Sequence, residues 1–453
     1  MSIFREYDIR GIYGKDLTDE IGKGVGKALG TLIRRAGGQQ IALGYDVRLS
    51  SPPLKAALLS GLLSTGVSAV DIGECPTPVL YFALYELEVD GGVMITASHN
   101  PGEFNGFKLC TGKHTLFGQE IQQIKTMIEM KDFETGDTPG EVRVEADFLS
   151  TYSDFFVKQF GVFEKKKVVI DCGNGAAALI APRIFEALGC EVIPLFCEAD
   201  GSFPNHHPDP TVPKNLEDLI RTVKSESADV GIAFDGDADR IGAVDEKGTI
   251  IWGDRLTLLF ATDILKTNPG ATIISEVKAS QIFYDEVARL GGKGIMWKTG
   301  HSLIKSKMKE SGALLAGEMS GHIFFADRYF GFDDAIYAGC RLVEILVRDK
   351  KPLSEHFKNL PESCVTPEIR IACPDDKKFE IAEQCRVFFS KYFKIIDIDG
   401  VRMKLQDGWA LIRASNTQPA LVLRFEASTP ARLQKNREGI EKYLKTLLDK
   451  LES

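Results

Sequence analysis

The sequence of 453 residues contains no apolar run approaching the ~20 residues that cross a bilayer, which argues against a membrane protein. Residues 1–6 include charged side chains where a signal peptide needs an apolar stretch, so we expect a cytoplasmic protein. The nine cysteines form no C-x-x-C pair, which argues against a zinc knuckle and for reduced thiols without a special role. The formal net charge of −9 disfavours nucleic-acid binding, which needs a basic surface.

What the chain does contain is typical of a globular protein of several domains. Hydrophobic residues make up 44% and charged residues 26% of the sequence. The length predicts three or four domains of roughly 100–150 residues each. One pattern occurs three times, over residues 41–95, 168–234 and 272–316: an apolar strand, a helical stretch, a second strand, and a third strand followed by polar residues. Such alternation predicts mostly parallel sheets whose corresponding strands end at equivalent edges.

The C-terminal part breaks this pattern. Four expected strands, at 394–398, 401–405, 409–414 and 421–427, are linked in part by Asp-Gly pairs, which favour tight hairpins. A helix is expected after Pro430. We therefore predict an α/β protein with three similar α/β domains of mixed, mostly parallel sheets around a central cleft, plus a C-terminal α+β domain. The expected domains are 1–143, 144–248, 249–362 and 363–453.

Ser98 ends the third strand of the first copy, within Ile95-Thr96-Ala97-Ser98-His99-Asn100-Pro101. A hydroxyl at the end of a strand in an open α/β sheet lies where ligands bind, so Ser98 is a candidate nucleophile. The alternative is a turn in which Ser98 and His99 only form capping hydrogen bonds. A generic serine hydrolase is disfavoured because no G-x-S-x-G sequence surrounds Ser98.

Asp235, Asp237 and Asp239 follow the third strand of the second copy. Three carboxylates at alternate positions repel one another without a cation, and a ligand set of oxygens alone favours Mg²⁺. An EF-hand is excluded because Arg240 takes the sixth position, where glycine is needed, and because the flanks look like strands. A solvated acidic turn is the remaining alternative. Arg240 adds a cation that can hold a phosphate oxygen.

Two further groups of polar residues follow expected strands. The run Arg413-Ala414-Ser415-Asn416-Thr417 combines a guanidinium, two hydroxyls and a carboxamide, a set of donors that suits phosphate. Glu318, Ser320 and His322 alternate after the third copy and suit sugar hydroxyls. Capped or hydrogen-bonded turns are the structural alternatives for both groups.

Lys108 and His301 also lie close to the ends of expected strands. Either side chain can exchange a proton with a sugar hydroxyl. Near the N-terminus, Tyr7 and Arg10 offer a phenol and another guanidinium.

Four motifs in this order resemble the α-D-phosphohexomutase superfamily, and most closely its bacterial phosphomannomutase/phosphoglucomutase branch. They are Thr96-Ala97-Ser98-His99-Asn100-Pro101, Asp235-Gly236-Asp237-Ala238-Asp239-Arg240, Gly317-Glu318-Met319-Ser320-Gly321-His322 and Arg413-Ala414-Ser415-Asn416-Thr417. The resemblance spans the whole chain, with one motif in each expected domain.

The resemblance implies a role for each group. Ser98 is the phosphorylated serine, next to His99, and binds Mg²⁺ together with Asp235, Asp237 and Asp239, while Arg240 supports it. Glu318, Ser320 and His322 hold sugar hydroxyls. The residues that anchor the non-reacting phosphate are Arg413, Ser415, Asn416 and Thr417. The residues that line the reaction centre are Tyr7, Arg10, Lys108, Lys278 and His301.

The implied reaction moves a phosphoryl group between C1 and C6 of mannose and glucose phosphates, through a hexose 1,6-bisphosphate that also serves as activator. A monomer without membrane or nucleic-acid partners is expected. Met319 favours this branch over a phosphoglucosamine mutase, which usually carries Gln there, and a non-catalytic sugar-phosphate-binding protein is the distant alternative. Ala238 replaces a glycine often seen in the metal loop, so we expect an ordinary backbone conformation at this position.

Overall fold

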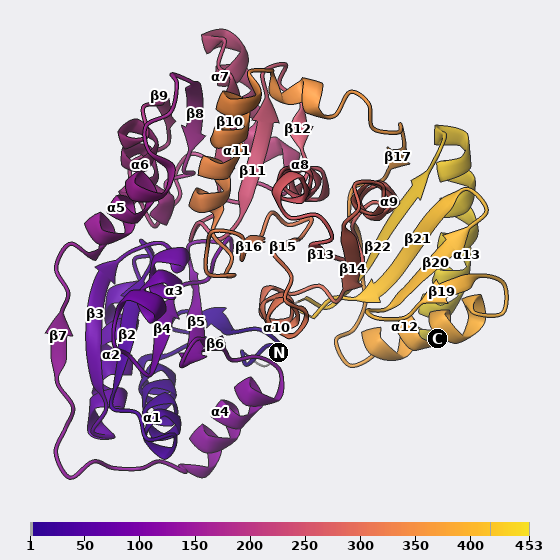
Figure 1. Ribbon diagram of the computed structural model, residues 1–453. Coiled ribbons are helices and arrows are strands. Elements are labelled where there is room, and N and C mark those ends of the chain that lie inside the picture. Colours follow the sequence, from indigo (N-terminus) through magenta and orange to yellow (C-terminus); the bar gives the residue numbers. More distant parts are fainter. Residues whose placement is uncertain (1–2, 417, 453) are drawn as a thin grey trace.

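The computed structural model describes residues 3–416 and 418–452. In this part of the chain the strands form four sheets, each in its own domain, from the N-terminal domain at the lower left of Figure 1 to the C-terminal domain at the right. None of the helices in these residues combines the length and the apolar character needed to cross a membrane.

The first domain is built on a seven-stranded sheet in the order β1-β5-β4-β2-β3-β7, with β6 paired to β5. Its elements are β1 (Ile9–Ile12), α1 (Asp19–Arg35), β2 (Gln40–Tyr45), α2 (Ser51–Ser64), β3 (Ser68–Glu74), α3 (Thr77–Glu86), β4 (Gly91–Ile95), β5 (Phe104–Thr111), β6 (His114–Thr115), α4 (Gln119–Met130) and β7 (Val142–Val144).

The second domain has a five-stranded sheet in the order β12-β11-β10-β8-β9. Its elements are α5 (Phe148–Phe160), β8 (Lys167–Asp171), the 3-10 helix η1 (Ala176–Leu179), α6 (Ala181–Ala187), β9 (Glu191–Leu195), the 3-10 helix η2 (Pro213–Leu216), α7 (Glu217–Glu226), β10 (Val230–Phe234), β11 (Ile241–Asp245) and β12 (Ile250–Ile251).

The third domain has a four-stranded sheet in the order β14-β13-β15-β16. Its elements are α8 (Gly253–Thr267), β13 (Thr272–Glu276), α9 (Gln281–Arg289), β14 (Lys293–Trp297), α10 (His301–Ser311), β15 (Leu315–Gly317), β16 (Ile323–Phe325), α11 (Ala335–Asp349) and the 3-10 helix η3 (Leu353–His356).

These three domains repeat one strand arrangement. In each, the strand that precedes a predicted site motif (β4, β10 or β15) lies between one parallel and one antiparallel neighbour. All five residues of β10 are buried, as expected for a parallel strand covered on both faces. Because the three strands occupy equivalent places, the motifs that follow them start from equivalent sheet edges.

The fourth domain has a largely antiparallel sheet in the order β17-β22-β21-β20-β19, with β18 paired to β22. The expected hairpins join β19 to β20 and β20 to β21, whereas β17 and β18 were not predicted. Its elements are β17 (Cys364–Val365), β18 (Ile369–Ala372), α12 (Lys378–Phe389), β19 (Lys394–Ile396), β20 (Val401–Leu405), β21 (Gly408–Ala414), β22 (Ala420–Ala427) and α13 (Pro430–Glu452).

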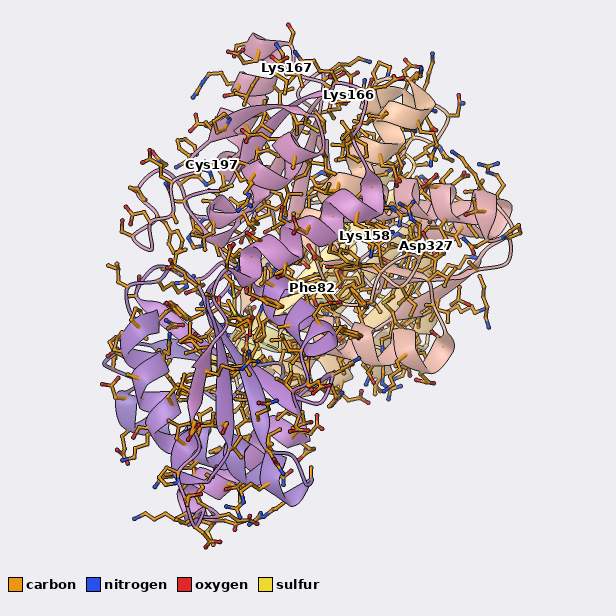
Figure 2. The ribbon with its side chains drawn as sticks, turned by 60° about the vertical axis from the view of Figure 1, so that its left-hand side comes forward. Phe82, Lys158, Lys166, Lys167, Cys197 and Asp327 are labelled. Carbon is orange, nitrogen blue, oxygen red and sulfur yellow. The ribbon has the colours of Figure 1, made fainter. Side chains whose placement is uncertain are left out.

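One apolar core continues through the first three domains, whereas the fourth domain has a core of its own. Phe82 of α3, labelled in Figure 2, lies at the junction of the first two domains. Its ring packs against Tyr152 and Phe155 of α5 and against Phe330. The apolar contact to the fourth domain is small and centres on Val277, Trp409 and Leu411. The first three domains therefore form one packed body on which the fourth is mounted separately.

The helical stretch expected after the first strand of the second repeat is interrupted. The segment divides into η1 and α6, and Ile180 between them has φ −148°. Pro182 in the first turn of α6 favours the start of a new helix there, because its fixed φ suits that position.

Candidate active site

Ser98 lies directly beyond β4 and is buried. Its Oγ donates to Oδ2 of Asp235 at 2.8 Å and lies 3.0 Å from Nδ1 of His99. The backbone of Ser98 has φ 52°, and its N–H donates to Oγ1 of Thr96 at 2.9 Å. A left-handed conformation costs a residue other than glycine free energy, so these hydrogen bonds hold the hydroxyl in its unusual position.

Arg48, which the sequence analysis did not single out, organises the serine loop. Its guanidinium is fully buried and pairs with Asp46, Nε to Oδ2 at 3.1 Å. It donates to four carbonyl oxygens, those of Ser98, Asn100, Pro101 and Phe104, at 2.6–3.0 Å. The sequence did contain an indication of this role, because the polar residues Asp46 and Arg48 directly follow a strand of the first repeat, as the site motifs do.

Asp235, Asp237 and Asp239 are fully buried beyond β10. Each offers a carboxylate oxygen within 4.8 Å of the others. Nζ of Lys108, on β5, donates to Oδ2 of Asp237 at 2.7 Å and to Oδ2 of Asp239 at 2.5 Å. Burial and the neighbouring carboxylates raise the pKa of Asp235 well above its ordinary value. Lys108 and Arg240 lower the pKa of Asp235 without offsetting this rise, and a further cation would favour its ionised form.

The donor set fits a magnesium ion. Oδ1 of Asp237 is buried and has no hydrogen-bond partner among the residues that the structure describes. With the Ser98 hydroxyl close to Asp235, the three aspartates provide only oxygen ligands, as Mg²⁺ prefers. A second buried group, Asp239, His322 and Asp333, includes a nitrogen ligand and suits Mg²⁺ less well.

The expected backbone conformation of Ala238 is wrong. Ala238 has φ 60°, the left-handed region in which glycine is favoured. Its carbonyl accepts from the N–H of Ala335 at 3.2 Å, and the carbonyl of the preceding Asp237 accepts from the N–H of Thr77 at 2.9 Å. The hydroxyl of Thr77 also donates to Oδ2 of Asp237 at 2.6 Å. Contacts from two other parts of the fold thus impose this conformation despite the methyl group.

His322 connects the predicted metal and sugar loops. Its Nε2 lies 3.2 Å from Oδ1 of Asp239 and 3.3 Å from Nε of Arg240. Its Nδ1 lies 2.9 Å from Oε2 of Glu318 and 3.0 Å from Oγ of Ser320. Nε of Arg240 in turn lies 3.8 Å from Oδ2 of Asp235. The structure therefore joins the second and third motifs.

Tyr7 joins three domains. Its hydroxyl donates to the carbonyl of Thr299 at 2.6 Å and accepts from Nδ2 of Asn416. The Tyr7 ring packs edge-on against the ring of His301, which stacks on His322 with ring centroids 5.6 Å apart. Nη1 of Arg10, on β1, donates to Oδ1 of Asn100 at 2.6 Å and so reaches the serine loop.

The phosphate-binding candidates lie at the end of β21 and in the loop that follows it. Nε of Arg413 donates to Oδ2 of Asp399 at 3.0 Å, and the N–H of Thr299 donates to the same oxygen at 3.0 Å. Oγ of Ser415 accepts from the N–H of Gln418 at 3.1 Å. Thr417 lies outside the described residues.

Lys278 connects the third and fourth domains. Its Nζ lies 3.4 Å from Oε1 of Glu276 and 3.1 Å from Oε2 of Glu368. Oε1 of Glu276 also accepts from the N–H of Met319 at 2.9 Å, which links Lys278 to the sugar motif. The sequence analysis missed Glu276, Glu368 and Asp399, because none belongs to a polar motif: Glu276 ends β13, Glu368 precedes β18 and Asp399 lies between β19 and β20.

The surroundings determine which groups carry charge. Burial lowers the pKa of Lys108, but the charges of Asp237 and Asp239 raise it by more than burial lowers it. The net shift is therefore upward. In the same way, burial lowers and Asp239 raises the pKa of His322, to about 9. Burial lowers the pKa of His301 well below its ordinary value. At neutral pH, Lys108 and His322 are therefore cations and His301 is a neutral imidazole.

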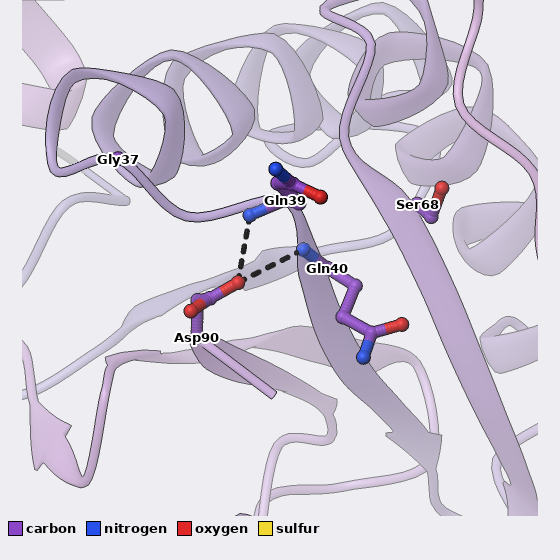
Figure 3. A pocket seen from close by; sticks show the side chains of 5 residues that line it. All are labelled: Gly37, Gln39, Gln40, Ser68 and Asp90. Carbon is purple, nitrogen blue, oxygen red and sulfur yellow. Dashed lines mark hydrogen bonds between the residues drawn. The ribbon is translucent and has the colours of Figure 1, made fainter. Parts of the chain in front are cut away.

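A hollow of about 390 Å³ in the first domain lies away from these residues and contains none of them. Gly37, Gln39, Gln40, Ser68 and Asp90 line it (Figure 3). Oδ2 of Asp90 accepts from the N–H groups of Gln39 and Gln40 at 2.7 and 3.1 Å. Its carboxylate thus holds the start of β2 in place, and the hollow lacks a set of groups directed at a ligand.

Four family models match the chain in sequence order. They are phosphoglucomutase/phosphomannomutase alpha/beta/alpha domain I at residues 1–135, domain II at 150–248, domain III at 252–364 and the C-terminal domain at 368–442.

Individual relatives are similar over nearly their whole length. The phosphomannomutase/phosphoglucomutase of Pseudomonas aeruginosa is 49% identical over 98% of this chain and 96% of its own. The phosphoglucomutase of Neisseria gonorrhoeae is 47% identical over 96% of this chain and 94% of its own. A crystal structure of a phosphoglucomutase/phosphomannomutase family protein from Burkholderia thailandensis superposes with a TM-score of 0.92 at 42% identity, covering 98% of this chain and 97% of that one.

Proposed function

Because the chain belongs to the phosphoglucomutase/phosphomannomutase family, we propose that Ser98 carries the phosphoryl group that this hexose phosphate mutase moves between C1 and C6 of its substrates. The contact between the Ser98 hydroxyl and the buried aspartates carries the proposal. A nucleophile next to an oxygen-only cation site suits phosphoryl transfer, which depends on positioning and charge neutralisation.

The cycle starts with phosphorylated Ser98. The phosphoryl group passes to the free hydroxyl of a hexose 1- or 6-phosphate, which gives a hexose 1,6-bisphosphate and unmodified Ser98. The bisphosphate then turns around, and its other phosphoryl group returns to Ser98 as the isomeric monophosphate leaves. The same hexose 1,6-bisphosphate serves as activator, since it phosphorylates Ser98 when the serine is free.

Asp235, Asp237 and Asp239 hold a magnesium ion together with Ser98 in this proposal. The ion, when bound, neutralises negative charge on the transferring phosphoryl group. Lys108 and Arg240 add positive charge at the same place. Lys108 pairs with Asp237 and Asp239, and its charge helps to lower the pKa of Asp239, which keeps that carboxylate ionised.

The remaining residues bind and orient the sugar. Arg413 anchors the phosphate that does not react, with Ser415, Asn416 and Thr417 as further donors. Glu318, Ser320 and His322 bind sugar hydroxyls beside the reacting centre. Tyr7, Arg10, Lys278, His99 and His301 complete the lining of this centre. The separate core of the fourth domain supports closure over the substrate, which excludes water and protects phosphoserine from hydrolysis.

Both mannose and glucose phosphates are proposed as substrates. Relatives at 47–49% identity are named for either sugar, and Met319 favours this pair over glucosamine phosphate. We place the protein in the cytoplasm as a monomer without membrane or nucleic-acid partners; the nine unpaired cysteines and the acidic net charge support this.

The test is a coupled assay with mannose 1-phosphate, glucose 1-phosphate and glucosamine 6-phosphate, each with Mg²⁺ and the corresponding bisphosphate. Turnover of the first two, abolished by EDTA, is the expected result. Turnover of glucosamine 6-phosphate alone would indicate a phosphoglucosamine mutase. No turnover with any of the three would contradict the proposal and favour a sugar-phosphate-binding protein.

A further inference from the structure

Cys172 and Cys197 form a dithiol pair in the second domain, although the sequence analysis gave the cysteines no role. Their Sγ atoms lie 3.3 Å apart, and both thiols are free. Cys172 directly follows β8 and Cys197 lies two residues beyond β9. These strands are parallel neighbours, with Asp171 opposite Leu195, so the two cysteines leave the sheet at the same edge.

The two thiols differ in access and acidity. Cys197 is half-buried near the outer part of the second domain, at the left of Figure 2, whereas Cys172 is fully buried. The hydrogen bond with Cys172 lowers the pKa of Cys197, and burial raises the pKa of Cys172. An accessible, more acidic thiol next to a buried partner is the arrangement expected of an attacking and a resolving cysteine.

We propose that Cys172 and Cys197 form a reversible intramolecular disulfide that lowers the activity of the neighbouring phosphoryl-transfer site. The oxidant is a low-molecular-weight disulfide, RSSR. The Cys197 thiolate attacks one sulfur of RSSR, which gives a mixed disulfide and releases one RS⁻. Cys172 then loses its proton, and its sulfur attacks Sγ of Cys197 and releases the second RS⁻. In sum, the two protein thiols give two electrons and two protons to RSSR and yield two RSH.

The segment after Cys172 contacts the proposed metal loop. The N–H of Gly175 donates to the carbonyl of Cys172 at 2.8 Å, and the N–H of Ala176 donates to the carbonyl of Gly236 at 2.9 Å. Gly175 and Gly236 are so close that a Cβ on Gly175 would lie 2.8 Å from the carbonyl oxygen of Gly236. Because Gly236 stands between Asp235 and Asp237, a shift of Cys172 is transmitted to the aspartates.

The segment after Cys197 contacts the serine loop through Arg48. The Cα of Gly201 packs on the backbone of Val47 and Arg48, and a Cβ there would lie 2.3 Å from the carbonyl oxygen of Val47. Nη2 of Arg48 donates to the carbonyl of Ser98 at 2.7 Å. A shift of Cys197 therefore reaches the proposed nucleophile.

The segments around Cys172 and Cys197 contain strained backbone, which favours a change of conformation when the disulfide forms. Asn174, Phe196 and Phe203 have φ 59°, 51° and 51°, values that residues other than glycine rarely adopt. A disulfide requires the sulfur atoms to approach from 3.3 Å to about 2.05 Å. Since β8 and β9 are held in register, the adjoining loops must absorb that movement.

The test uses the full-length protein, equilibrated with oxidised glutathione and then freed of it. We expect a mass decrease of two hydrogen atoms, a Cys172–Cys197 cross-link in non-reducing peptide mapping, and kcat about tenfold lower, because sub-ångström to ångström displacements of catalytic groups have large effects. Dithiothreitol should restore both mass and activity. The mapping is independent of the proposed function, while the kcat measurement rests on it.

Cys197→Ser should retain basal activity and lose the response to oxidised glutathione. The matched control is Cys364→Ser, which removes a half-buried thiol in the fourth domain and should respond as the wild type does. Absence of the cross-link in the wild-type protein would overturn the proposal. A cross-link with unchanged kcat, or loss of kcat that persists in Cys197→Ser, would also contradict it.

Discussion

Oγ of Ser98 lies 2.8 Å from Oδ2 of Asp235, although 137 positions separate the two residues in the chain. Each follows the equivalent strand of its own domain, β4 for Ser98 and β10 for Asp235. A phosphoryl group on this hydroxyl would bring further negative charge to buried carboxylates. In the proposed reaction the pair thus requires a cation, which connects the proposed nucleophile to the proposed metal site.

Replacement of Ser98 by Ala should reduce mutase activity at least about a thousandfold even with bisphosphate present, because the acceptor of the phosphoryl group is lost. The coupled assay with glucose 1-phosphate measures this. Ser320→Ala keeps the nucleophile and removes one hydrogen-bonding hydroxyl, so we expect a loss of only about tenfold. Full activity of Ser98→Ala would contradict a phosphoserine mechanism.

Magnesium should raise the melting temperature of the wild-type protein. Binding to the folded state stabilises it by about 2.7 kcal/mol at a hundredfold excess over Kd. Differential scanning fluorimetry with MgCl₂ or EDTA measures the shift. Asp237→Asn changes only the group of Asp235, Asp237 and Asp239 and should abolish the shift in melting temperature. Asp333→Asn changes only the group of Asp239, His322 and Asp333 and should retain the shift. The opposite pattern would place the ion between Asp239, His322 and Asp333.

The ion pair of Glu368 with Lys278 should stabilise the attachment of the fourth domain in a pH-dependent way. Lys278 lowers the pKa of Glu368 from 4.5 to about 2. A carboxyl with a lowered folded-state pKa adds stability above its unfolded pKa and loses it as the pH falls through the folded pKa. Wild type should therefore be more stable than Glu368→Gln by about 1–2 kcal/mol at pH 7, and this difference should disappear between pH 4.5 and 2.

Melting temperatures of both proteins across this pH range provide the measurement. Glu383→Gln is the matched control, since the pair of Glu383 with Arg386 is exposed and such pairs contribute little. A difference between wild type and Glu368→Gln that does not change with pH would contradict the assignment.

Ala238→Gly should cost less stability than Ala233→Gly, although both alanines are buried in the same region. Each change loses a buried methyl group and adds backbone entropy to the unfolded chain. Only at position 238 does glycine also relieve a positive φ, an advantage of about 1–2 kcal/mol. Denaturant unfolding of the two variants tests this; an equal loss would show that Ala238 is not strained.

Local patterns in the sequence were sufficient to predict the threefold repeat and the four motifs. Burial of β4, β10 and β15 follows from their apolar runs, and polar residues at their ends are visible without a structure. The conformation of Ala238 was predicted wrongly, because contacts from Thr77 and Ala335 impose it and both are distant in the chain.

The sequence by itself determined the apolar strands β4, β10 and β15 and the polar residues that follow them, since these properties depend on neighbouring residues. Only the tertiary structure decided that Arg48 holds the Ser98 loop, that Lys108 neutralises Asp237 and Asp239, and that Cys172 meets Cys197. The physical reason is that these contacts depend on strand register and domain packing. Both result from many weak interactions across the whole chain, so they cannot be recognised from the residue at a single position.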